Sequence, residues 1–534
     1  MKDKDFKINS KPMNNFWLAR FLIFILIIFI SFALVLFGIN VKSIVKEHVI
    51  MLGYGAFGQS TSHKNALFTY FSKKLDFNEI LEIPLITIDI QDKDFNKIIQ
   101  KRKQALISGI LIKTADDTVP GKIFHNNEEF DISIRLKGDW TEHLEHEDKW
   151  SFRIQLDDDL FLGMEEFSIQ HPKQREFQSE PLFYSMLSDF GVITPRHFFV
   201  SVVINNHNIG IMALEEHFSE EILQNNNRPE GVIFKYSEDL LWQSRVNESS
   251  VLYENFYNND IVPFDKKTVF NDSNLLEQFF TGKKLLRSLK EPNTKPSEIF
   301  DADKMGKYLA IIDIWGARHA LFWHNLRFYL NPKTGKLEPI AFDASMSYRE
   351  NHEDRSVEKE EFSRILMGDK LIYEVYLKTL GEVENYLNTS VSIYDLNEKL
   401  YSELTNEFYY VPKFDIESLK YRLYNVRLDT VKDMKYISDY DNEYVDLIKS
   451  SLFASEEFSN IIQLENISPF TISIINITDE LGNELGFDYK GESIISGRGL
   501  KTINLNYKYP LDKIHLEYRI INESFTMQEE LVRF

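Results

Sequence analysis

The spacing of hydrophobic and polar residues changes several times along this chain. A run that is apolar apart from Arg20 near its start covers residues 17–39, and the alternating apolar and polar positions of strands begin near residue 80. Apolar residues recur at helical spacing over 270–320 and 355–450, and short alternating runs return from about residue 455. This pattern predicts an α+β unit over residues 80–450, with antiparallel strands first and helices later, and a small β-sandwich over residues 451–534.

The apolar run at residues 17–39 is long enough to cross about 30 Å of hydrocarbon as a helix. A cleaved signal peptide would have a shorter apolar core and a small-residue cleavage site, whereas VKSIVKEHV follows here. Lysine and arginine are more frequent on the N-terminal side, which predicts a cytoplasmic tail over residues 1–16. We therefore expect a single-pass cell-membrane protein with a linker over residues 40–79 and the bulk of the chain outside the cytoplasm.

Turn residues between apolar runs predict two hairpins. In the first, β-rich runs flank NNHN, whose Asn residues tolerate the positive φ that a tight turn requires. In the second, LRFYL pairs with LEPIAF across NPKTGK, which would bring Asn325 and Asp343 together at the open end. Two interpretations remain open for these side chains: they hold a metal ion, or they cap backbone groups.

Basic residues gather on two of the predicted strands. Arg135 and Lys137 lie two residues apart in RLKGDW, and Lys149 lies four residues before an arginine in KWSFRIQL, so each pair shares one face of a strand. The four cations predict a positive surface that suits a triphosphate, although they could also line a solvent-exposed face. Glu215 and Glu216 end the first hairpin, and either could pair with one of these cations.

Composition narrows the classes of function. The chain has 534 residues, of which 43% are hydrophobic and 14% aromatic, so it can bury large cores. Its formal net charge of −21 argues against nucleic acid as the main partner. It contains no cysteine, which excludes disulfides, a thiolate nucleophile and a cysteine-based zinc site.

Several segments follow one another in an informative order from about Ile132 to Tyr348: RLKGDW, KWSFRIQL, FSIQHPKQREF, MLSDFG, VVINNHNIGIMALEEHF, VIFKYS, WHNLRFY and EPIAFD. This order resembles the spore-coat-protein-H (CotH) kinase-like family. Members are atypical protein kinases that use ATP and a divalent metal to phosphorylate serine on partner proteins. The resemblance implies an atypical protein-kinase-like domain that uses ATP and Mg²⁺, with a protein or polymer of the cell envelope as the phosphate acceptor.

The resemblance also implies roles for particular residues. Lys149 would bind the nucleotide phosphates, with Arg135 or Lys137 assisting. Glu216 would orient one of these basic residues. Asn325 and Asp343 would hold the metal.

One departure from the family concerns the catalytic base. The family generally carries an Asp a few residues before the His-Asn pair, but GARHALFWHN has no carboxylate between Gly316 and Asn325. His319 could serve as the base, because an imidazole pKa of about 6.5 suits proton abstraction, or Asp313 could reach in from IIDIW. The alternative to a kinase is a non-catalytic protein that binds a polymer or partner of the cell envelope through a degenerate kinase-like domain.

Overall fold

The computed structural model describes most of the chain from residue 83 onward. The described ranges are 83–157, 159–246, 255–291, 294–346, 355–432, 448–454, 460–466, 472–488, 494–495, 500–505, 513–520 and 526–532. The predicted tail, anchor and linker at 1–16, 17–39 and 40–79 lie outside the described residues.

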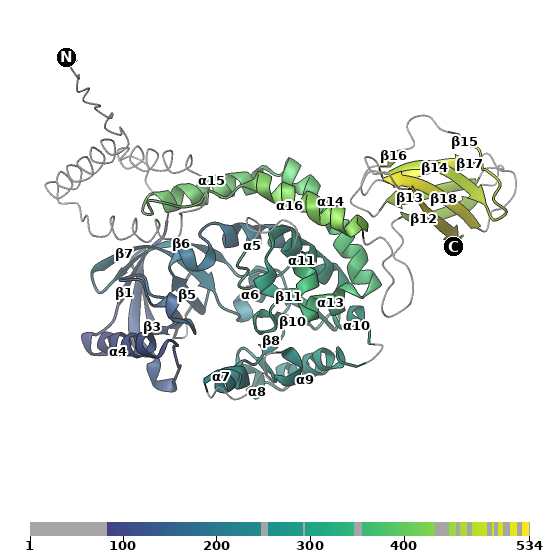
Figure 1. The fold of residues 1–534 in the computed structure, drawn as a ribbon. Coiled ribbons are helices and arrows are strands. Elements are labelled where there is room, and N and C mark those ends of the chain that lie inside the picture. The colour runs from purple at the N-terminus through teal and green to yellow at the C-terminus, as the bar shows by residue number, and fades with distance from the viewer. Residues whose placement is uncertain are drawn as a thin grey trace, which may run out of the picture. The chain divides into compact units, whose positions relative to one another are not determined.

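Seven strands near the start of the described chain close into a barrel (Figure 1). They are β1 (Leu85–Asp89), β2 (Val119–His125), β3 (Glu128–Leu136), β4 (Phe152–Leu156), β5 (Glu166–Gln170), β6 (His197–Ile204) and β7 (His207–Glu216). Their order around the barrel is β1–β2–β3–β4–β5–β7–β6. The barrel closes because β6 runs parallel to β1, with Leu85 opposite Ser201. Apolar side chains at alternate strand positions, such as Ile132 and Ile134, are buried in its core.

Local sequence signals account for the ends of several elements. Helix α4 (Asp92–Ser108), which packs against β2 and β3, ends at Gly109 with φ of 81°, the left-handed conformation that glycine adopts most readily. The turn between β6 and β7 consists of Asn205 and Asn206, with φ of 48° and 63°. The first predicted hairpin is therefore confirmed, with asparagines at the two positions that require positive φ.

A second sheet has the order β11–β10–β8–β9. Its strands are β8 (Ile233–Tyr236), β9 (Ile261–Pro263), β10 (Arg327–Asn331) and β11 (Lys336–Ile340). Arg327 lies opposite Ile340, so the second predicted hairpin is also confirmed. Arg327 lies opposite Lys235 as well, and cross-strand partners share a face, so both cations belong to one face of this sheet.

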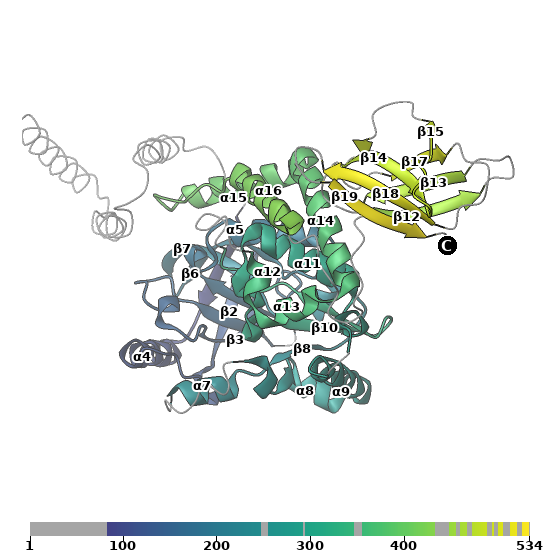
Figure 2. The ribbon, with the colours of Figure 1, turned by 45° about the vertical axis from the view of Figure 1, so that its right-hand side comes forward.

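Helices surround the second sheet, as Figures 1 and 2 show. They are α5 (Ser179–Asp189), α6 (Glu220–Asn225), α7 (Asp239–Val246), α8 (Lys266–Asn271), α9 (Ser273–Ser288), α10 (Pro296–Ile299), α11 (Ala302–Trp315), α12 (Ser356–Lys359), α13 (Glu361–Met367), α14 (Lys370–Thr389), α15 (Val391–Thr405) and α16 (Ile416–Lys432). Helix α11 is buried along most of its length, from Met305 to Trp315, because it packs against α5, α14, α16 and β11. It is the central helix of the larger hydrophobic core.

Two further sheets lie at the C-terminal end of the chain. One has the order β12–β13–β17–β15 and the other β16–β14–β18–β19. Their strands are β12 (Ile448–Ala454), β13 (Asn460–Asn466), β14 (Ile472–Asp479), β15 (Phe487–Asp488), β16 (Ile494–Ile495), β17 (Leu500–Leu505), β18 (Lys513–Ile520) and β19 (Thr526–Val532). All pairings within them are antiparallel. The domain boundaries drawn from the sequence, 80–450 and 451–534, stay predictions.

The predicted fold class was wrong in two respects. The first strands do not form the antiparallel sheet expected of a kinase-like α+β domain, but a closed barrel with one parallel pair. Periodicity identifies strands but not their partners, and the β1–β6 pairing spans more than a hundred residues. In addition, no helix among the described residues is long and apolar enough to cross a membrane, so the membrane-spanning part of the prediction is not borne out.

Candidate functional site

Arg175 is the centre of a buried group of charges. It ends the 3-10 helix Pro172–Arg175, and 8% of its side chain is exposed. Its Nη1 donates to Asp343, its Nε lies 3.1 Å from Glu180 Oε2, and its Nη2 lies 3.5 Å from Glu215 Oε2. The three carboxylates come from the segment after β11, from α5 and from β7. One guanidinium therefore joins three separate elements.

Lys137 reaches the same group from the end of β3. Its Nζ lies 2.7 Å from Glu215 Oε2 and 3.1 Å from Gln170 Oε1, and Gln170 Nε2 donates to that glutamate oxygen at 3.0 Å. Burial lowers the pKa of Lys137 to about 8, against the opposing charge of Glu215. Burial disfavours ionised Glu215, but Arg175 and Lys137 hold its pKa well below its usual range. Arg175, Lys137, Glu180, Glu215 and Asp343 are named the Arg175 cluster below.

His319 contacts the backbone and the side chain of Asp343, and Asn325 contacts His319. His319 Nδ1 lies 3.1 Å from the Asp343 carbonyl oxygen and 3.6 Å from its Oδ1. Asn325 Nδ2 lies 3.1 Å from His319 Nδ1 and 3.0 Å from the His319 carbonyl oxygen. Burial opposes a charged His319 ring, but its contacts with Asp343 raise its pKa above the ordinary value. The two ends of the second hairpin therefore meet through His319.

The charge of Asp343 is stabilised from two sides. Burial would raise the pKa of this carboxyl, but the Arg175 guanidinium and His319 together hold it well below its usual range. Asp343 is therefore ionised at neutral pH. It also has a φ of 50°, in the left-handed region that non-glycine residues rarely adopt.

Arg327 is a buried cation on the second sheet. It is 5% exposed, and its guanidinium carbon lies 4.5 Å from the ring centre of Phe342 and 5.5 Å from that of Phe264. Its Nη1 donates to the His324 carbonyl oxygen at 2.7 Å. Among the described residues, no carboxylate lies within ion-pair distance of it. Burial lowers its pKa to about 10, against the opposing charges of Glu238, Asp343 and Glu215, so the environment as a whole disfavours its charge.

The electrostatics of His217 involve charges from both the barrel and the second sheet. Burial first, and then the charges of Arg153, Lys137, Lys235 and Arg327, hold its pKa well below the ordinary value. Three of these cations also have carboxylate partners: Lys137 pairs with Glu215, Lys235 with Glu238, and Arg153 with Glu166. Glu166 Oε2 also lies 3.6 Å from His217 Nε2.

Lys149, which was predicted to bind phosphates, lies in a different environment. Its Nζ is 2.7 Å from Glu407 Oε1 and donates to the carbonyl oxygens of Ile209 and Ile211 at 2.5 and 3.0 Å. These partners belong to β7 and to the segment after α15. The lysine that pairs with Glu215 is Lys137.

Glu216 and Arg135 also have partners outside the Arg175 cluster. Both carboxylate oxygens of Glu216 bind Arg196, one through its guanidinium and one through its backbone N–H. Arg135 Nη1 donates to the Leu136 carbonyl oxygen at 3.3 Å, and burial and the nearby Arg153 lower its pKa. Of the two adjacent glutamates that end the first hairpin, Glu215 is the one in the cluster.

Asp313, one of the two candidate bases, is fully buried within α11. Its carboxylate accepts hydrogen bonds from Tyr376 Oη at 2.7 Å, from the Ser356 N–H at 2.5 Å and from Arg355 Nε at 3.3 Å. These contacts join α11 to α12 and α14. The structure brings His319, and not Asp313, together with Asn325 and Asp343.

Sequence reasoning did not single out Arg175, Glu180, Lys235 or Arg327. The available signal was that three of them lie in segments that carry the family resemblance, FSIQHPKQREF, VIFKYS and WHNLRFY. Their importance depends on contacts across more than a hundred residues, such as Arg175 with Asp343. No local pattern contains that information.

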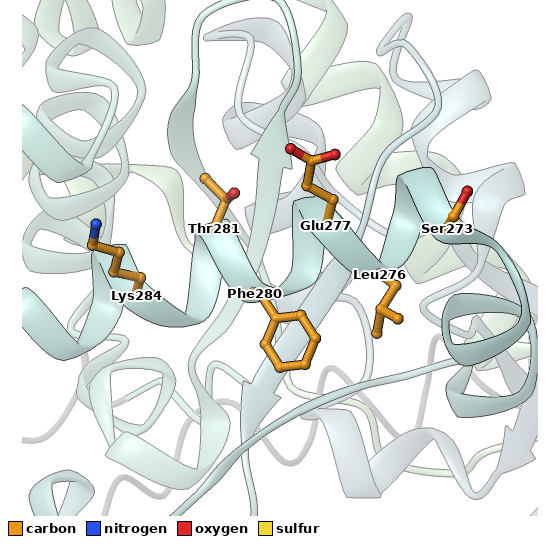
Figure 3. Close-up of a pocket in the computed structure, with 6 residues that line it drawn as sticks. All are labelled: Ser273, Leu276, Glu277, Phe280, Thr281 and Lys284. Carbon is orange, nitrogen blue, oxygen red and sulfur yellow. The ribbon is translucent and has the colours of Figure 1, made fainter.

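A separate hollow lies along α9. Figure 3 shows Ser273, Glu277, Thr281 and Lys284 on one side of this helix and Leu276 and Phe280 on the other. Phe280 is 58% exposed, and the opposite face of the helix packs through Phe279 and Gly282 on the second sheet. None of the residues lining this hollow belongs to the Arg175 cluster.

Acid should destabilise the fold through buried neutral histidines. Burial lowers the pKa of His143 and of His171 to about 3, and that of His197 to about 4. An unfolded histidine binds a proton near pH 6.5, so the stability these residues contribute is present above that pH and is lost as the pH falls towards 4. We expect the protonation of each of these histidines to lower the free energy of unfolding by about 2 kcal/mol when the pH falls from 7.5 to 5.

Urea unfolding at these two pH values tests this expectation. His197→Gln should reduce the pH dependence by about the contribution of one histidine, about 2 kcal/mol. His207→Gln is the matched control, because the His207 side chain is 66% exposed. Equal pH dependence in the wild type and in His197→Gln would contradict the expectation.

Comparison with known proteins covers the part of the chain that carries these residues. Inner spore coat protein H of Bacillus subtilis (strain 168) is 24% identical over 243 residues, which cover 45% of this chain and 65% of that protein. The match thus spans less than two thirds of the relative's length. By its name the relative is a spore coat protein, so this comparison, like the described helices, contradicts the prediction of a single-pass membrane protein.

The family model described as CotH kinase protein matches residues 134–389. This segment begins within β3, ends with α14, and contains the whole Arg175 cluster with His319 and Asn325. The resemblance drawn from short segments of the sequence is confirmed over this part of the chain: residues 134–389 match the family model described as CotH kinase protein.

Proposed function

We propose that this chain is a CotH-type phosphotransferase. In this proposal Lys137 and Asp343 of the Arg175 cluster, together with the neighbouring cations, bind ATP with Mg²⁺, and the γ-phosphoryl group passes to a serine hydroxyl of a partner protein. The observation that carries the proposal is that the buried Lys137–Glu215 ion pair shares Arg175 with Asp343. A lysine paired with a glutamate, close to an aspartate and an asparagine, is the arrangement that protein kinases use around a metal-bound nucleotide.

The cations support a polyphosphate ligand. Arg327 is buried without a carboxylate in ion-pair contact among the described residues, and it shares one face of the second sheet with Lys235. Concentrated positive charge in a buried site lowers stability unless an anion binds there. Phosphate oxygens would supply that negative charge, and guanidinium groups bind them well.

Asp343 and Asn325 have side-chain oxygens of the kind that Mg²⁺ binds. Among the described residues, no group of three or more His, Asp or Glu side chains is arranged to hold a metal ion. Mg²⁺ on a nucleotide needs only one or two protein ligands, because phosphates and water supply the others. The ionised carboxylate of Asp343 and the amide oxygen of Asn325 are suitable donors. When bound, the metal would neutralise charge on the phosphates.

His319 is the residue we assign as the base. In the tautomer in which Nδ1 donates to the Asp343 carbonyl oxygen, the lone pair on Nε2 would accept the proton. The serine oxygen would then bond to the γ-phosphorus as the bond to the bridging oxygen of ADP breaks, and the serine proton would pass to His319. Asp313 is unsuited to this role because three hydrogen bonds already hold its buried carboxylate.

A non-catalytic binding protein is the second candidate. One observation favours it: the Asp343 carboxylate is already held by Arg175. Arg175 contacts Oδ1, so a metal would have to bind through the second carboxylate oxygen or displace the guanidinium. If neither takes place, the fold could bind a partner without transferring phosphate.

Replacement of Asp343 by Asn tests the phosphotransferase directly. We expect the wild type with Mg²⁺ and γ-labelled ATP to label itself or added serine peptides, and Asp343→Asn to reduce labelling by about 10²–10³-fold, because a preorganised charge is lost. Asp303→Asn, at a half-exposed site, is the control and should keep full labelling. Mg²⁺-dependent nucleotide binding without labelling in the wild type would favour the second candidate. If the wild type shows no nucleotide binding and no labelling, the proposal is overturned.

A further inference from the structure

The segment after β11 has an uncommon backbone. Asp343 and Ser345 have φ of 50° and 36°, and the facing residues Glu176 and Phe177 have φ of 53° and 58°. None of the four is glycine, and such conformations persist only where surrounding contacts hold them. The contacts that hold residues 343–346 in this conformation therefore also determine the orientation of Asp343.

Two glutamates accept hydrogen bonds from the backbone of this segment. Glu180 Oε1 accepts from the Ala344 N–H at 3.1 Å, and Glu176 Oε1 accepts from the Met346 N–H at 2.9 Å. Glu176 Oε1 also lies 3.4 Å from Ser345 Oγ. Together with Arg175 on the Asp343 carboxylate, residues 175–180 contact every residue from 343 to 346.

Glu180 is itself held in place on several sides. It is 1% exposed, its Oε1 also accepts from Tyr184 Oη at 2.7 Å, and its Oε2 lies 3.1 Å from Arg175 Nε. Tyr184 lies one turn further along α5. Glu180 Oε1 thus accepts hydrogen bonds both from Tyr184 of α5 and from the Ala344 amide, which fixes the position of the side chain.

We propose that Glu176 and Glu180 are positioning residues that hold residues 343–346 in the conformation in which Asp343 contacts both Arg175 and His319. Neither glutamate contacts the reacting groups in the proposed chemistry. Each acts through a backbone amide of the segment that carries Asp343. Their effect on phosphoryl transfer rests on the proposed function, whereas their effect on the backbone does not.

Hydrogen exchange of the backbone amides tests the structural part on the full chain without nucleotide. Glu180→Gln and Glu176→Gln keep an oxygen acceptor but lose the negative charge that strengthens these hydrogen bonds. Each should therefore speed exchange at the amide that it holds, Ala344 for Glu180 and Met346 for Glu176, by about tenfold, a difference of about 1.4 kcal/mol. Exchange in the helices away from the contact, such as α14, should not change. Glu220→Gln is the matched control, because Glu220 is an exposed glutamate at the start of α6.

A turnover measurement tests the functional part. Glu180→Gln and Glu176→Gln should each lower kcat for labelling by about tenfold. The KM for Mg-ATP should rise by a smaller factor, because the cations on the barrel and the second sheet are unchanged. Glu176→Asp should recover part of the activity if backbone contact is what matters. A merely structural role would raise exchange throughout α5 and the core and would not separate kcat from KM.

The outcomes distinguish the two ideas. Unchanged exchange at residues 343–346 in both variants, or a uniform rise across the chain, overturns the proposal. Faster local exchange with an unchanged kcat overturns the positioning role in transfer. If the wild type shows no transfer, the proposed function fails, and the exchange result still decides whether the two glutamates hold the segment. Should Glu180→Gln not fold, the less buried Glu176 still provides the test.

Discussion

Replacing Arg175 by Met is expected to lower the free energy of unfolding by about 3–5 kcal/mol, the usual cost of removing one partner from a buried ion pair. Arg175 is the cation that contacts Asp343, Glu180 and Glu215 at once. Without it, three carboxylates from three elements would remain close together in a buried site. They would repel one another and take up protons, so the fold would lose the electrostatic contact that joins the barrel, α5 and the segment after β11.

The pH dependence of this loss follows from the pKa of Asp343, which Arg175 helps to hold well below its usual range although burial opposes this. A depressed carboxyl pKa contributes stability above about pH 4, and that contribution disappears as the pH falls through the folded value. The difference between the wild type and Arg175→Met should therefore shrink in acid. Urea unfolding at pH 7 measures the full effect. Arg287→Met is the control, because its side chain is 61% exposed, and a loss below about 1 kcal/mol for Arg175→Met would contradict the expectation.

Lys137→Met is expected to reduce phosphoryl transfer by about 10²–10³-fold, whereas Lys149→Met should keep transfer within about tenfold of the wild type. Lys137 is paired with Glu215 in the Arg175 cluster. Lys149 is held by Glu407 and by two carbonyl oxygens of β7. Both lysines are largely buried, with 12% and 6% of their side chains exposed, so the two variants are matched in environment.

Stability must be measured beside activity for this pair. Lys149→Met leaves Glu407 without its cation and should destabilise the contact between β7 and the segment after α15. Assays are therefore run at a temperature where urea unfolding shows both variants to be folded. Equal loss of transfer in the two variants would contradict the assignment of Lys137 as the lysine that binds phosphate.

The meeting of Asn325 and Asp343 could be predicted from the sequence, because a hairpin brings its two ends together whatever surrounds it. The orientation of Lys149 could not. The prediction counted Lys149 and Arg153 on one face of a strand, but β4 begins at Phe152, so the alternation does not extend back to Lys149. The choice between Glu215 and Glu216 was equally open, since adjacent strand residues point to opposite faces and both are buried here.

The rest of the site depends on distant contacts. Arg175 and Asp343 are separated by 168 residues, and the barrel closes through a pairing of β1 with β6. Residue types and local spacing contain no record of either contact. The order of the family segments indicated that the segments of Arg175 and Asp343 belong to one domain. The contact of Arg175 with Asp343 became visible only in the structure.

Calorimetric titration with Mg-ATP tests most directly whether the Arg175 cluster is a nucleotide site. Wild type and Lys149→Met should bind with dissociation constants within about threefold of each other, and Lys137→Met should bind at least about tenfold more weakly, a difference of about 1.4 kcal/mol. Omission of Mg²⁺ should weaken binding to the wild type, and Asp343→Asn should remove this dependence on the metal. No binding to the wild type, or loss of binding in Lys149→Met with retention in Lys137→Met, would contradict the claim.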